Sequence, residues 1–543
     1  MPAAPPEVLS IGQPRLTAGL DRLRRIDLVG YQAVFGELPR LTAEQLIRMA
    51  ERVDLRGRGG AAFPVARKLA AVRGAARKRK RRPIVLVNGA EGEPGSAKDK
   101  MLLLRSPYLV LGGAVTAARA LQARDILVAV NDGMAARSVR EAAAAEPLLR
   151  RMVGVVEVPD RFVSGESGAL VNAVNGHTPL PSGRHSHASH SGAGNRPTLL
   201  SNVETFAQLA VLAMVGPEGY ASAGLADEPG TVLLTVGGSA ARPAVVEVPT
   251  GRSLGSVLDL CAVGPADGVL VGGYHGCWLP EEAAYNVPVS RAGLAAVGGT
   301  LGAGIVLALG QDTCPLGEVA QVAAFLAKES SGQCGPCKLG LPGIARSLAS
   351  LADGSGGATA LDTARRGAAA VRGRGACAHP DGAFRFVMSA LDVFTDDLAA
   401  HVCGRGCGRP VNNYLPLPPV PGEVRLTVDW TRCRGHGLCA HIVPELMQLD
   451  EQGYPVMLDM PVPPWLEHGA RRAADMCPGL ALRLTPASPA SAPDTTERGW
   501  VGRALSGGHQ PEAVTIPDLI VSEEWISEIL AARDPNPGEA DDL

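Results

Sequence analysis

The chain has 543 residues, which is enough for three or more domains. Its composition is globular, with 46% hydrophobic residues, 20% charged residues and a formal net charge of −2, and this argues against a nucleic-acid-binding or membrane-surface protein. No run of 18 uncharged apolar residues predicts a membrane span and the first residues lack the pattern of a secretory signal, so we expect a cytoplasmic protein, with membrane association only through a partner.

Four regions with different patterns precede residue 413. Residues 1–50 are predicted to form an amphipathic helical segment. Residues 51–228 alternate apolar strands with Ala-rich helical stretches, which is the pattern of an α/β domain. Residues 229–312 are rich in strands and glycines with one helical piece, and residues 313–412 are predicted to be helical. The expected strands cover residues 84–87, 126–130, 231–236, 244–248 and 268–271, and the expected helices cover residues 114–123, 135–145 and 253–261.

The C-terminal part begins with a stiff proline-rich linker over Pro416–Pro421. Residues 423–485 are predicted to form a compact unit. Residues 486–543 are rich in Pro, Ser, Ala and Gly at their start and are predicted to be a mostly disordered tail, with a short helix over Asp518–Ala532.

Eight of the eleven cysteines follow residue 330, and six of these fall into two sets of three. Ligands spaced three residues apart let one short loop wrap an iron–sulfur cluster, and a distant cysteine completes the site. Such spacing in a cytosolic chain favours metal over disulfides. We therefore predict two iron–sulfur sites, whose candidate ligands are Ser331, Cys334, Cys337 and Cys377 in the first and Cys433, His436, Cys439 and Cys477 in the second.

Each set has a residue other than cysteine at one ligand position. Ser331 can ligate as an alkoxide, its iron can bind water or be absent, or the cluster can be lost; we expect a retained cluster because three thiolates and the loop spacing remain. His436 can ligate through a ring nitrogen or stand aside from a 3Fe–4S centre. Zinc is the alternative for this set of three cysteines and one histidine.

The five other cysteines are assigned no ligand role. Cys261, Cys277 and Cys314 are predicted to be buried apolar residues, and Cys403 and Cys407 are predicted to be structural.

Four segments, three of which contain glycine, are candidates for ligand binding. Glycines in Arg56–Pro64 allow backbone N–H groups to approach a ligand ahead of a helix, where anions are favoured, and Lys68 adds positive charge. Asn88–Asp99 places acidic residues after a strand, where open α/β sheets bind ligands. Ser164–Leu170 and Arg196–Thr205 are uninformative when each is taken alone.

In this order, the four segments and the first cysteine set resemble the flavin-binding subunit of respiratory complex I, a module that also occurs in NAD-linked hydrogenases and formate dehydrogenases. The resemblance spans residues 20–407 and implies an α/β FMN-binding domain, a β-grasp module over residues 229–312 and a helical iron–sulfur domain. It implies that Phe63 stacks on the nicotinamide and that Glu93 lies at the nucleotide. The residues that it implies for FMN are Gly57, Arg58, Gly59, Lys68, Asn88, Glu91, Gly165, Glu166, Asn202 and Thr205.

The sequence departs from the family pattern at several of these positions. In the family a second Glu follows the one matched by Glu166; it faces the nucleotide ribose and repels a 2′-phosphate. Ser167 removes that repulsion, so NADPH, weakly bound NADH or another electron donor all remain open. Further departures are Leu69 for Trp, Ala90 for Asp, Ser201 for Asn and Ser331 for the first cluster cysteine.

Residues 423–484 resemble a single-cluster bacterial ferredoxin of the actinobacterial type. The residues that carry the resemblance are an opening strand at Val424–Asp429, the spacing of Cys433, His436 and Cys439, and the later Cys477–Pro478 pair. It implies an α+β ferredoxin-like domain with a 3Fe–4S cluster or a 4Fe–4S cluster that has an unusual ligand.

Together the resemblances imply an NAD(P)H dehydrogenase in which FMN accepts a hydride and single electrons pass through the first cluster to the fused ferredoxin. No side chain is predicted to act as a general acid or base. The alternatives are a non-catalytic electron carrier with a vestigial nucleotide pocket and, more weakly, a structural zinc-and-flavin subunit. The acceptor stays open among a monooxygenase, a membrane cytochrome and a complex subunit, as does the presence of the family's thioredoxin-like 2Fe–2S partner.

Overall fold

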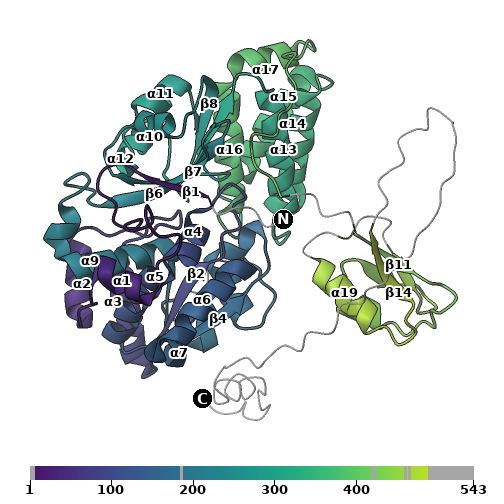
Figure 1. The fold of residues 1–543 in the computed structure, drawn as a ribbon. Helices are drawn as coiled ribbons and strands as arrows, with labels where there is room; N and C mark the ends of the chain where they lie inside the picture. The colour runs from purple at the N-terminus through teal and green to yellow at the C-terminus, as the bar shows by residue number, and fades with distance from the viewer. Residues whose placement is uncertain (1–5, 184–186, 419–423, 458–461, 463–465, 487–543) are drawn as a thin grey trace, which may run out of the picture. The chain divides into compact units, whose positions relative to one another are not determined.

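The computed structural model describes residues 6–183, 187–418, 424–457, 462 and 466–486. It divides into two units, residues 1–417 and 418–543, which are described separately (Figure 1). Nearly all of the predicted tail, with its short helix, lies outside the described residues, as does the second half of the predicted linker.

A parallel four-stranded sheet forms the first layer of the large unit, in the order β4-β3-β2-β5. Its strands are β2 (Ile84–Gly89), β3 (Ile126–Val130), β4 (Val153–Glu157) and β5 (Thr198–Asn202). The central strand β3 is buried along its whole length, as expected for a parallel strand covered on both faces. The strands and helices predicted around residues 84–145 are present in the structure.

Helices cover this sheet and connect its strands (Figure 1). α5 and α9 pack so closely that a Cβ atom at Gly113 would lie 1.8 Å from the carbonyl oxygen of Phe206, so only glycine fits there. The helices are α1 (Leu28–Phe35), α2 (Ala43–Arg52), α3 (Val65–Arg79), α4 (Lys98–Arg105), α5 (Pro107–Leu121), α6 (Gly133–Ala145), α7 (Pro147–Met152), α8 (Ser167–Val174) and α9 (Val203–Ala221).

A mixed six-stranded sheet follows, in the order β1-β7-β6-β10-β8-β9. Its strands are β1 (Glu7–Ser10), β6 (Thr231–Gly238), β7 (Ala244–Pro249), β8 (Ala266–Val271), β9 (Cys277–Leu279) and β10 (Ile305–Gly310). β1 pairs in parallel with β7, so the prediction of a wholly helical N-terminal segment is wrong for these residues. The buried Glu247 carboxylate fixes the chain after β1, because it accepts hydrogen bonds from the N–H groups of Arg15, Leu16 and Thr17.

Three helices accompany this sheet where one was predicted: α10 (Leu254–Leu260), α11 (Glu281–Asn286) and α12 (Arg291–Ala296). The two unpredicted helices have six residues each, which is too short for a clear helical period.

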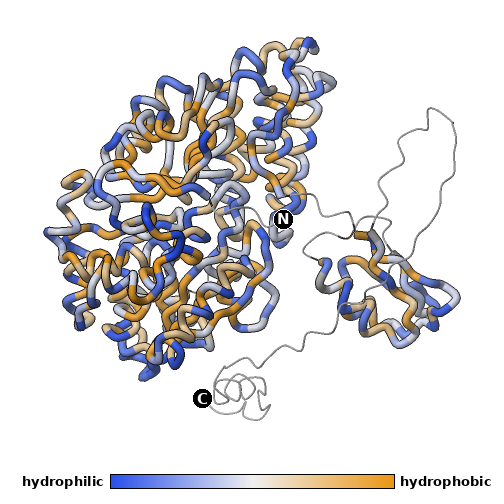
Figure 2. The backbone as a smooth tube through the Cα atoms, in the orientation of Figure 1, coloured by the Kyte–Doolittle hydropathy of each residue, from blue (hydrophilic) through white to orange (hydrophobic). Residues whose placement is uncertain are grey.

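The rest of the large unit is helical, as predicted: α13 (Pro315–Lys328), α14 (Leu341–Ala352), α15 (Gly357–Val371), α16 (His379–Val393) and α17 (Thr395–Val402), with one wide π-type turn at Pro336–Gly340. Its hydrophobic core continues under β8, β9 and β10. Apolar residues concentrate inside the unit, and its outer loops are largely hydrophilic (Figure 2).

The second unit is built on two small antiparallel ribbons. β11 (Val424–Val428) pairs with β14 (Leu482–Pro486), and β12 (Met447–Leu449) pairs with β13 (Pro455–Met457). The two helices, α18 (Leu438–Ile442) and α19 (Glu467–Asp475), contribute to a core with the strands.

Across the described ranges, no single helix is both long enough and apolar enough to span a membrane; α4 and α5 pass that test only as a pair, and they are bent by 93°.

Candidate functional site

The first and fourth predicted segments meet at the carboxyl edge of the parallel sheet. The Arg58 N–H donates a hydrogen bond of 2.9 Å to Thr205 Oγ1. A Cβ atom at Gly59 would lie 3.2 Å from the Cβ atom of Asn202, so the glycine loop lies directly on the turn after β5. Open α/β sheets bind their ligands at this edge.

The second and third segments meet at the same edge. Asn88, at the end of β2, stands opposite Asn202 in register and donates from Nδ2 to the carbonyl oxygen of Gly165 at 2.9 Å. A Cβ atom at Gly165 would lie 2.7 Å from the carbonyl oxygen of Ala90, which excludes any larger residue. Glu166 then caps α8 by accepting the N–H groups of Gly168 and Ala169.

A cation and an exposed aromatic ring follow the glycine loop. Lys68 Nζ donates to the Leu200 carbonyl oxygen at 2.8 Å, and burial lowers the pKa of Lys68. The Phe63 side chain is exposed, and Lys68 Nζ lies 6.0 Å from its ring centroid. An exposed ring beside this edge is free to stack on a planar ligand.

The two predicted acidic residues have different surroundings. Glu91 is buried, and its carboxylate accepts hydrogen bonds from the Ser96 hydroxyl and from the N–H groups of Asp99 and Lys100. It therefore organises the turn into α4. Glu93 is half-buried, and its carboxylate accepts the N–H of Tyr274, from the loop between β8 and β9, at 2.5 Å.

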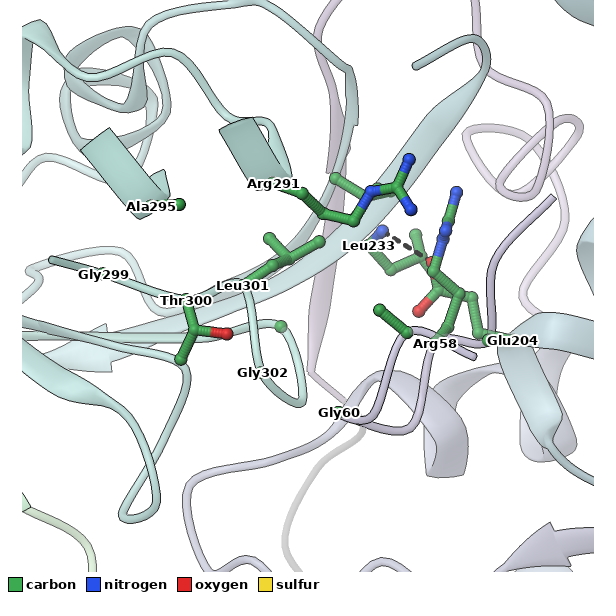
Figure 3. Close-up of a pocket in the computed structure, with 14 residues that line it drawn as sticks. Arg58, Gly60, Glu204, Leu233, Arg291, Ala295, Gly299, Thr300, Leu301 and Gly302 are labelled. Atoms are coloured by element: carbon green, nitrogen blue, oxygen red, sulfur yellow. Dashed lines mark hydrogen bonds and ion pairs between the residues drawn. The ribbon is translucent and has the colours of Figure 1, made fainter. Parts of the chain in front are cut away.

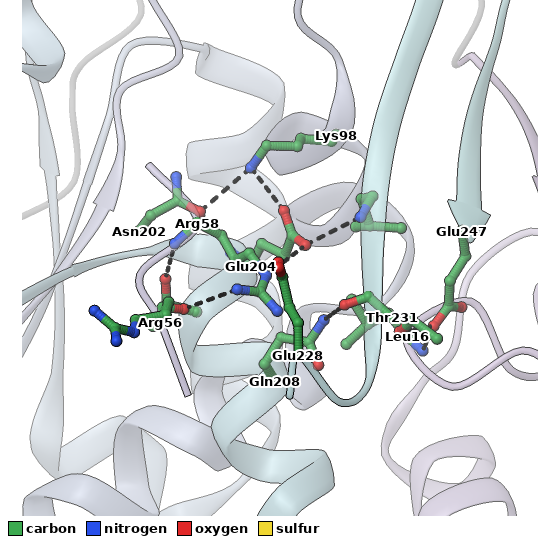
Figure 4. Close-up of polar contacts among 12 residues, drawn as sticks. Leu16, Arg56, Arg58, Lys98, Asn202, Glu204, Gln208, Glu228, Thr231 and Glu247 are labelled. Carbon is green, nitrogen blue, oxygen red and sulfur yellow. Dashed lines mark hydrogen bonds and ion pairs between the residues drawn. The ribbon is translucent and has the colours of Figure 1, made fainter. Parts of the chain in front are cut away.

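A buried ion cluster lies beneath the glycine loop, and the sequence analysis assigned it no role (Figure 4). Lys98 Nζ lies 3.0 Å from Glu204 Oε2, 2.9 Å from Asp99 Oδ1 and 3.3 Å from Asn202 Oδ1. Burial alone would lower the pKa of Lys98, but the surrounding carboxylates raise it above its ordinary value. Lys98 lies in the second segment and Glu204 in the fourth. Their place in these segments was the only feature of the sequence that pointed to a role for them.

The ion cluster joins the two sheets of the large unit. Glu204 Oε1 accepts the N–H of Leu233 in β6 at 3.0 Å and lies 3.7 Å from Arg58 Nε. Nearby, the Ala97 N–H donates to Thr235 Oγ1 at 3.1 Å. The glycine loop, α4 and α9 are thereby fixed against the six-stranded sheet.

A cavity of about 110 Å³ separates the glycine loop from the loop at residues 299–304 (Figure 3). Arg58, Glu204 and Arg291 supply its charged side chains. Gly57 and Arg58, two of the residues implied for FMN, line this cavity, so it adjoins the candidate flavin site.

The carboxyl edge has the features that FMN requires. The positions of Gly59 and Gly165 leave the backbone open to close approach. Ser164 Oγ, directly before Gly165, is buried and has no hydrogen-bond partner among the residues that the structure describes, so a bound polar ligand can satisfy it. Lys68 supplies positive charge beside β5, where its Nζ donates to the Leu200 carbonyl oxygen.

The candidate ligands of the first cluster lie on the loop after α13 and on the turn before α16. Ser331 and Cys337 are buried, and Cys334 and Cys377 are partly buried. Burial, reinforced by the neighbouring Cys334 and Cys377 thiols, raises the pKa of Cys337 to about 12. The three thiols are therefore close enough to affect one another, as ligands of one cluster must be.

The turn directly before the third segment contacts the loop that carries Ser331. The Phe162 N–H donates to Glu329 Oε2 at 3.1 Å, and Arg161 Nη2 donates to the Ser330 carbonyl oxygen at 3.4 Å. The Phe162 ring lies 5.5 Å from the ring of His379, two residues after Cys377. Only Ser164 separates the turn at Phe162–Val163 from Gly165, so the candidate flavin and cluster sites are neighbours.

In the second unit, all four predicted ligands line one pocket, together with Pro478. Gly435 and Gly437 flank His436 with φ values of 68° and 71°, a left-handed conformation that lets the loop turn tightly. No three ligand atoms of this set lie within 4.8 Å of one another in the described structure.

Comparisons with known proteins agree with this geometry. Three family descriptions match: "Nuo51 FMN-binding domain" over residues 50–211, "NADH-ubiquinone oxidoreductase-F iron-sulfur binding region" over residues 318–401 and "4Fe-4S single cluster domain" over residues 426–484. They confirm the predictions of FMN and of two iron–sulfur clusters.

Curated relatives that are named as F-type subunits of NADH-quinone oxidoreductase match the large unit. That of Mycobacterium tuberculosis is 30% identical over 404 residues, which is 70% of this chain and 89% of the relative. That of Escherichia coli is 27% identical over 395 residues, which is 69% of this chain and 88% of the relative. The crystal structure of an NAD⁺-reducing [NiFe]-hydrogenase in the air-oxidised state matches with a TM-score of 0.66 and 26% identity, and covers 77% of this chain and 74% of its own.

The first prediction concerns pH. Burial raises the pKa of Glu93 to about 8, with Glu91 adding to the rise and the Tyr274 N–H opposing it. The unfolded carboxyl titrates near 4.5, so between these values the folded protein holds a proton that the unfolded chain has released. The free energy of unfolding should fall across that window by up to about 1.4 kcal/mol per pH unit from this group. Above pH 8 the contribution of Glu93 to the free energy of unfolding no longer changes with pH.

Urea unfolding followed by tryptophan fluorescence at pH 6 and pH 8 measures this loss. Glu93→Gln should reduce the difference in unfolding midpoint between the two pH values, while Glu282→Gln, at an exposed carboxylate, should leave it unchanged. Equal pH dependence in Glu93→Gln and the unsubstituted protein would contradict the assignment.

The second prediction concerns the missing cysteine of the first cluster. Ser331→Cys supplies a fourth thiolate from a buried position at ligand spacing. Iron release to a chelator should slow by about tenfold or more, because even outer partners of metal ligands change affinity by about 10- to 100-fold. Ser138→Cys is the control, since Ser138 is also buried but lies on α6, outside the cluster loop. The same release rate in both variants would show that position 331 does not face iron.

Proposed function

Because the chain belongs to the family of F-type subunits of NADH-quinone oxidoreductase, we propose that it oxidises NADH at FMN and passes the electrons through its first iron–sulfur cluster to its own ferredoxin domain. The observation that carries this proposal is the contact of the turn before Gly165 with the cluster loop, through Phe162 and Glu329. Neighbouring redox sites suit an oxidoreductase that passes electrons inward from the nucleotide.

In this proposal, the protein side chains bind and orient FMN and the nucleotide. When bound, FMN supplies the conversion of a two-electron hydride transfer into single-electron steps. The glycine loop and Asn88 shape the flavin site, Lys68 supplies positive charge, and Phe63 stacks on the nicotinamide. Glu93 lies at the nucleotide position, and no side chain is assigned as a general acid or base.

We assign the six-stranded sheet and α10 to the β-grasp type and the second unit to the α+β ferredoxin-like type. The domains then comprise residues 51–228 for FMN, 229–312 for the β-grasp module, 313–412 for the first cluster and 423–485 for the ferredoxin. The fused ferredoxin supports delivery to a redox protein, because tethering raises the effective concentration of the carrier.

The acceptor is a monooxygenase, a membrane cytochrome or a complex subunit. Since the relatives are named as subunits, we place this chain in a multi-subunit assembly, in which a thioredoxin-like 2Fe–2S protein is a candidate partner. A nucleic acid has no place among the proposed partners.

Ser167 determines which nucleotide is preferred in this proposal. It is exposed at the start of α8, and its hydroxyl donates to Glu166 Oε1 at 3.1 Å. A serine lacks the negative charge that would repel a 2′-phosphate, so the pocket tolerates NADPH as well as NADH.

The third prediction tests whether the protein oxidises a nicotinamide nucleotide at the flavin and whether Ser167 sets the preference between NADH and NADPH. Ser167→Glu should lower kcat/KM for NADPH relative to NADH by about tenfold, which corresponds to about 1.4 kcal/mol of repulsion. Ser167→Ala, which removes the hydroxyl and adds no charge, should leave the ratio unchanged. Anaerobic titration of the full chain with each nucleotide, followed by flavin absorbance, is the direct assay. If neither nucleotide bleached the flavin, the proposal would fail and the vestigial-pocket alternative would stand.

A further inference from the structure

A compact group of metal-ligating side chains in the helical region includes none of the predicted cluster ligands. Cys314 Sγ, His401 Nε2 and Cys407 Sγ all lie within 4.8 Å of one another. In the described parts of the chain, no other three Cys, His, Asp or Glu residues bring their ligand atoms this close. The sequence analysis assigned Cys314 to the apolar core and Cys407 to a structural role.

From this geometry we propose that Cys314, His401 and Cys407 bind a structural Zn²⁺ ion. Tetrahedral zinc has Zn–S distances of about 2.3 Å and Zn–N distances of about 2.0–2.1 Å, which separate a sulfur ligand from a nitrogen ligand by about 3.5 Å. The distance from Cys314 Sγ to His401 Nε2 is 3.5 Å. Two thiolates and an imidazole are the donor types that zinc prefers.

The surroundings of His401 favour a ligand over an ordinary core histidine. The side chain is buried, and Nδ1 has no hydrogen-bond partner among the described residues. Nε2 faces Cys314 Sγ and the N–H of Cys407, which lies 3.2 Å away. Nε2 accepts the Cys407 N–H, and within the described ranges the polar contacts given for this ring all come from Cys314 and Cys407.

The two cysteines lie at the start of α13 and in the segment after α17. The Gly317 N–H donates to Cys314 Sγ at 3.4 Å, and Cys314 caps the N-terminus of α13, where negative charge is favoured. Two residues after Cys407, Arg409 pairs with Asp267 and Asp397. Such outer contacts orient zinc ligands and stabilise their charge.

A zinc ion here would hold the last part of the large unit in place. The Cys314 N–H donates to the Pro410 carbonyl oxygen at 2.6 Å, so the segment after Cys407 lies along the start of α13. The fourth zinc position is left for water or for the exposed Cys403, whose C-x₃-C spacing with Cys407 falls within the range of zinc sites. Zinc has no redox chemistry, so this site takes no part in electron transfer.

Metal analysis of the full-length protein, purified with FMN and iron in place, tests the proposal. The protein should contain about one zinc ion per chain. Cys407→Ser and His401→Ala should lose the zinc and keep the iron and flavin content. His401→Cys should retain zinc, because it restores a ligand of the same class. The control Cys261→Ser, at a buried cysteine of the six-stranded-sheet module, should keep both metals.

Cys337→Ser separates this site from the first cluster. This variant should lose the iron of the first cluster and keep its zinc. The proposal would be overturned if iron-replete protein contained no zinc, if Cys407→Ser kept its zinc, or if Cys407→Ser lost iron in its place. Retained flavin in the Cys407→Ser variant, whose side chain is only partly buried, shows that the large unit remains folded.

Discussion

The buried ammonium group of Lys98 is the interaction on which the large unit depends. It lies between Glu204 and Asp99, with Asn202 beside it, where no solvent reaches it. Removing one member of such a group leaves an uncompensated buried charge, which costs about 3–5 kcal/mol. Because Glu204 also accepts the N–H of Leu233, the same ions align the parallel sheet with the six-stranded sheet.

That alignment places the flavin segments and the first cluster next to each other. The carboxyl edge of the parallel sheet gathers the glycine loop, Asn88 and Gly165 at one place. From there the turn at Phe162 runs directly to Glu329 on the cluster loop. The arrangement of the two candidate sites is thus fixed by hydrogen bonds between backbone groups and the side chains of Thr205, Asn88 and Glu329.

The sequence predicted the parts of the fold whose signals are local. β3 is a continuous apolar run and α6 is a long Ala-rich stretch, and both occur where expected. β1 was missed because a four-residue edge strand is defined by its distant partner β7. α11 and α12 were missed because six residues show no clear period.

In the candidate site, too, local features could be predicted from the sequence and contacts between distant segments could not. Residues that belong to contiguous motifs, such as Gly59 and Gly165, could be singled out from the sequence, and the structure brings their segments together. Lys98 and Glu204 stood in the same motifs, but their pairing joins different segments and needed the fold. Likewise, nothing in the spacing of Cys314, His401 and Cys407 indicates that they meet.

The central claim is that electrons from NADH reach both clusters through the flavin. Low-temperature EPR of the anaerobic full-length protein before and after NADH addition, with iron quantitation, tests it most directly. The account predicts that NADH produces signals of two different reduced clusters, in proportion to the iron content. Flavin bleaching without any cluster signal, or cluster signals that appear with dithionite and never with NADH, would contradict it.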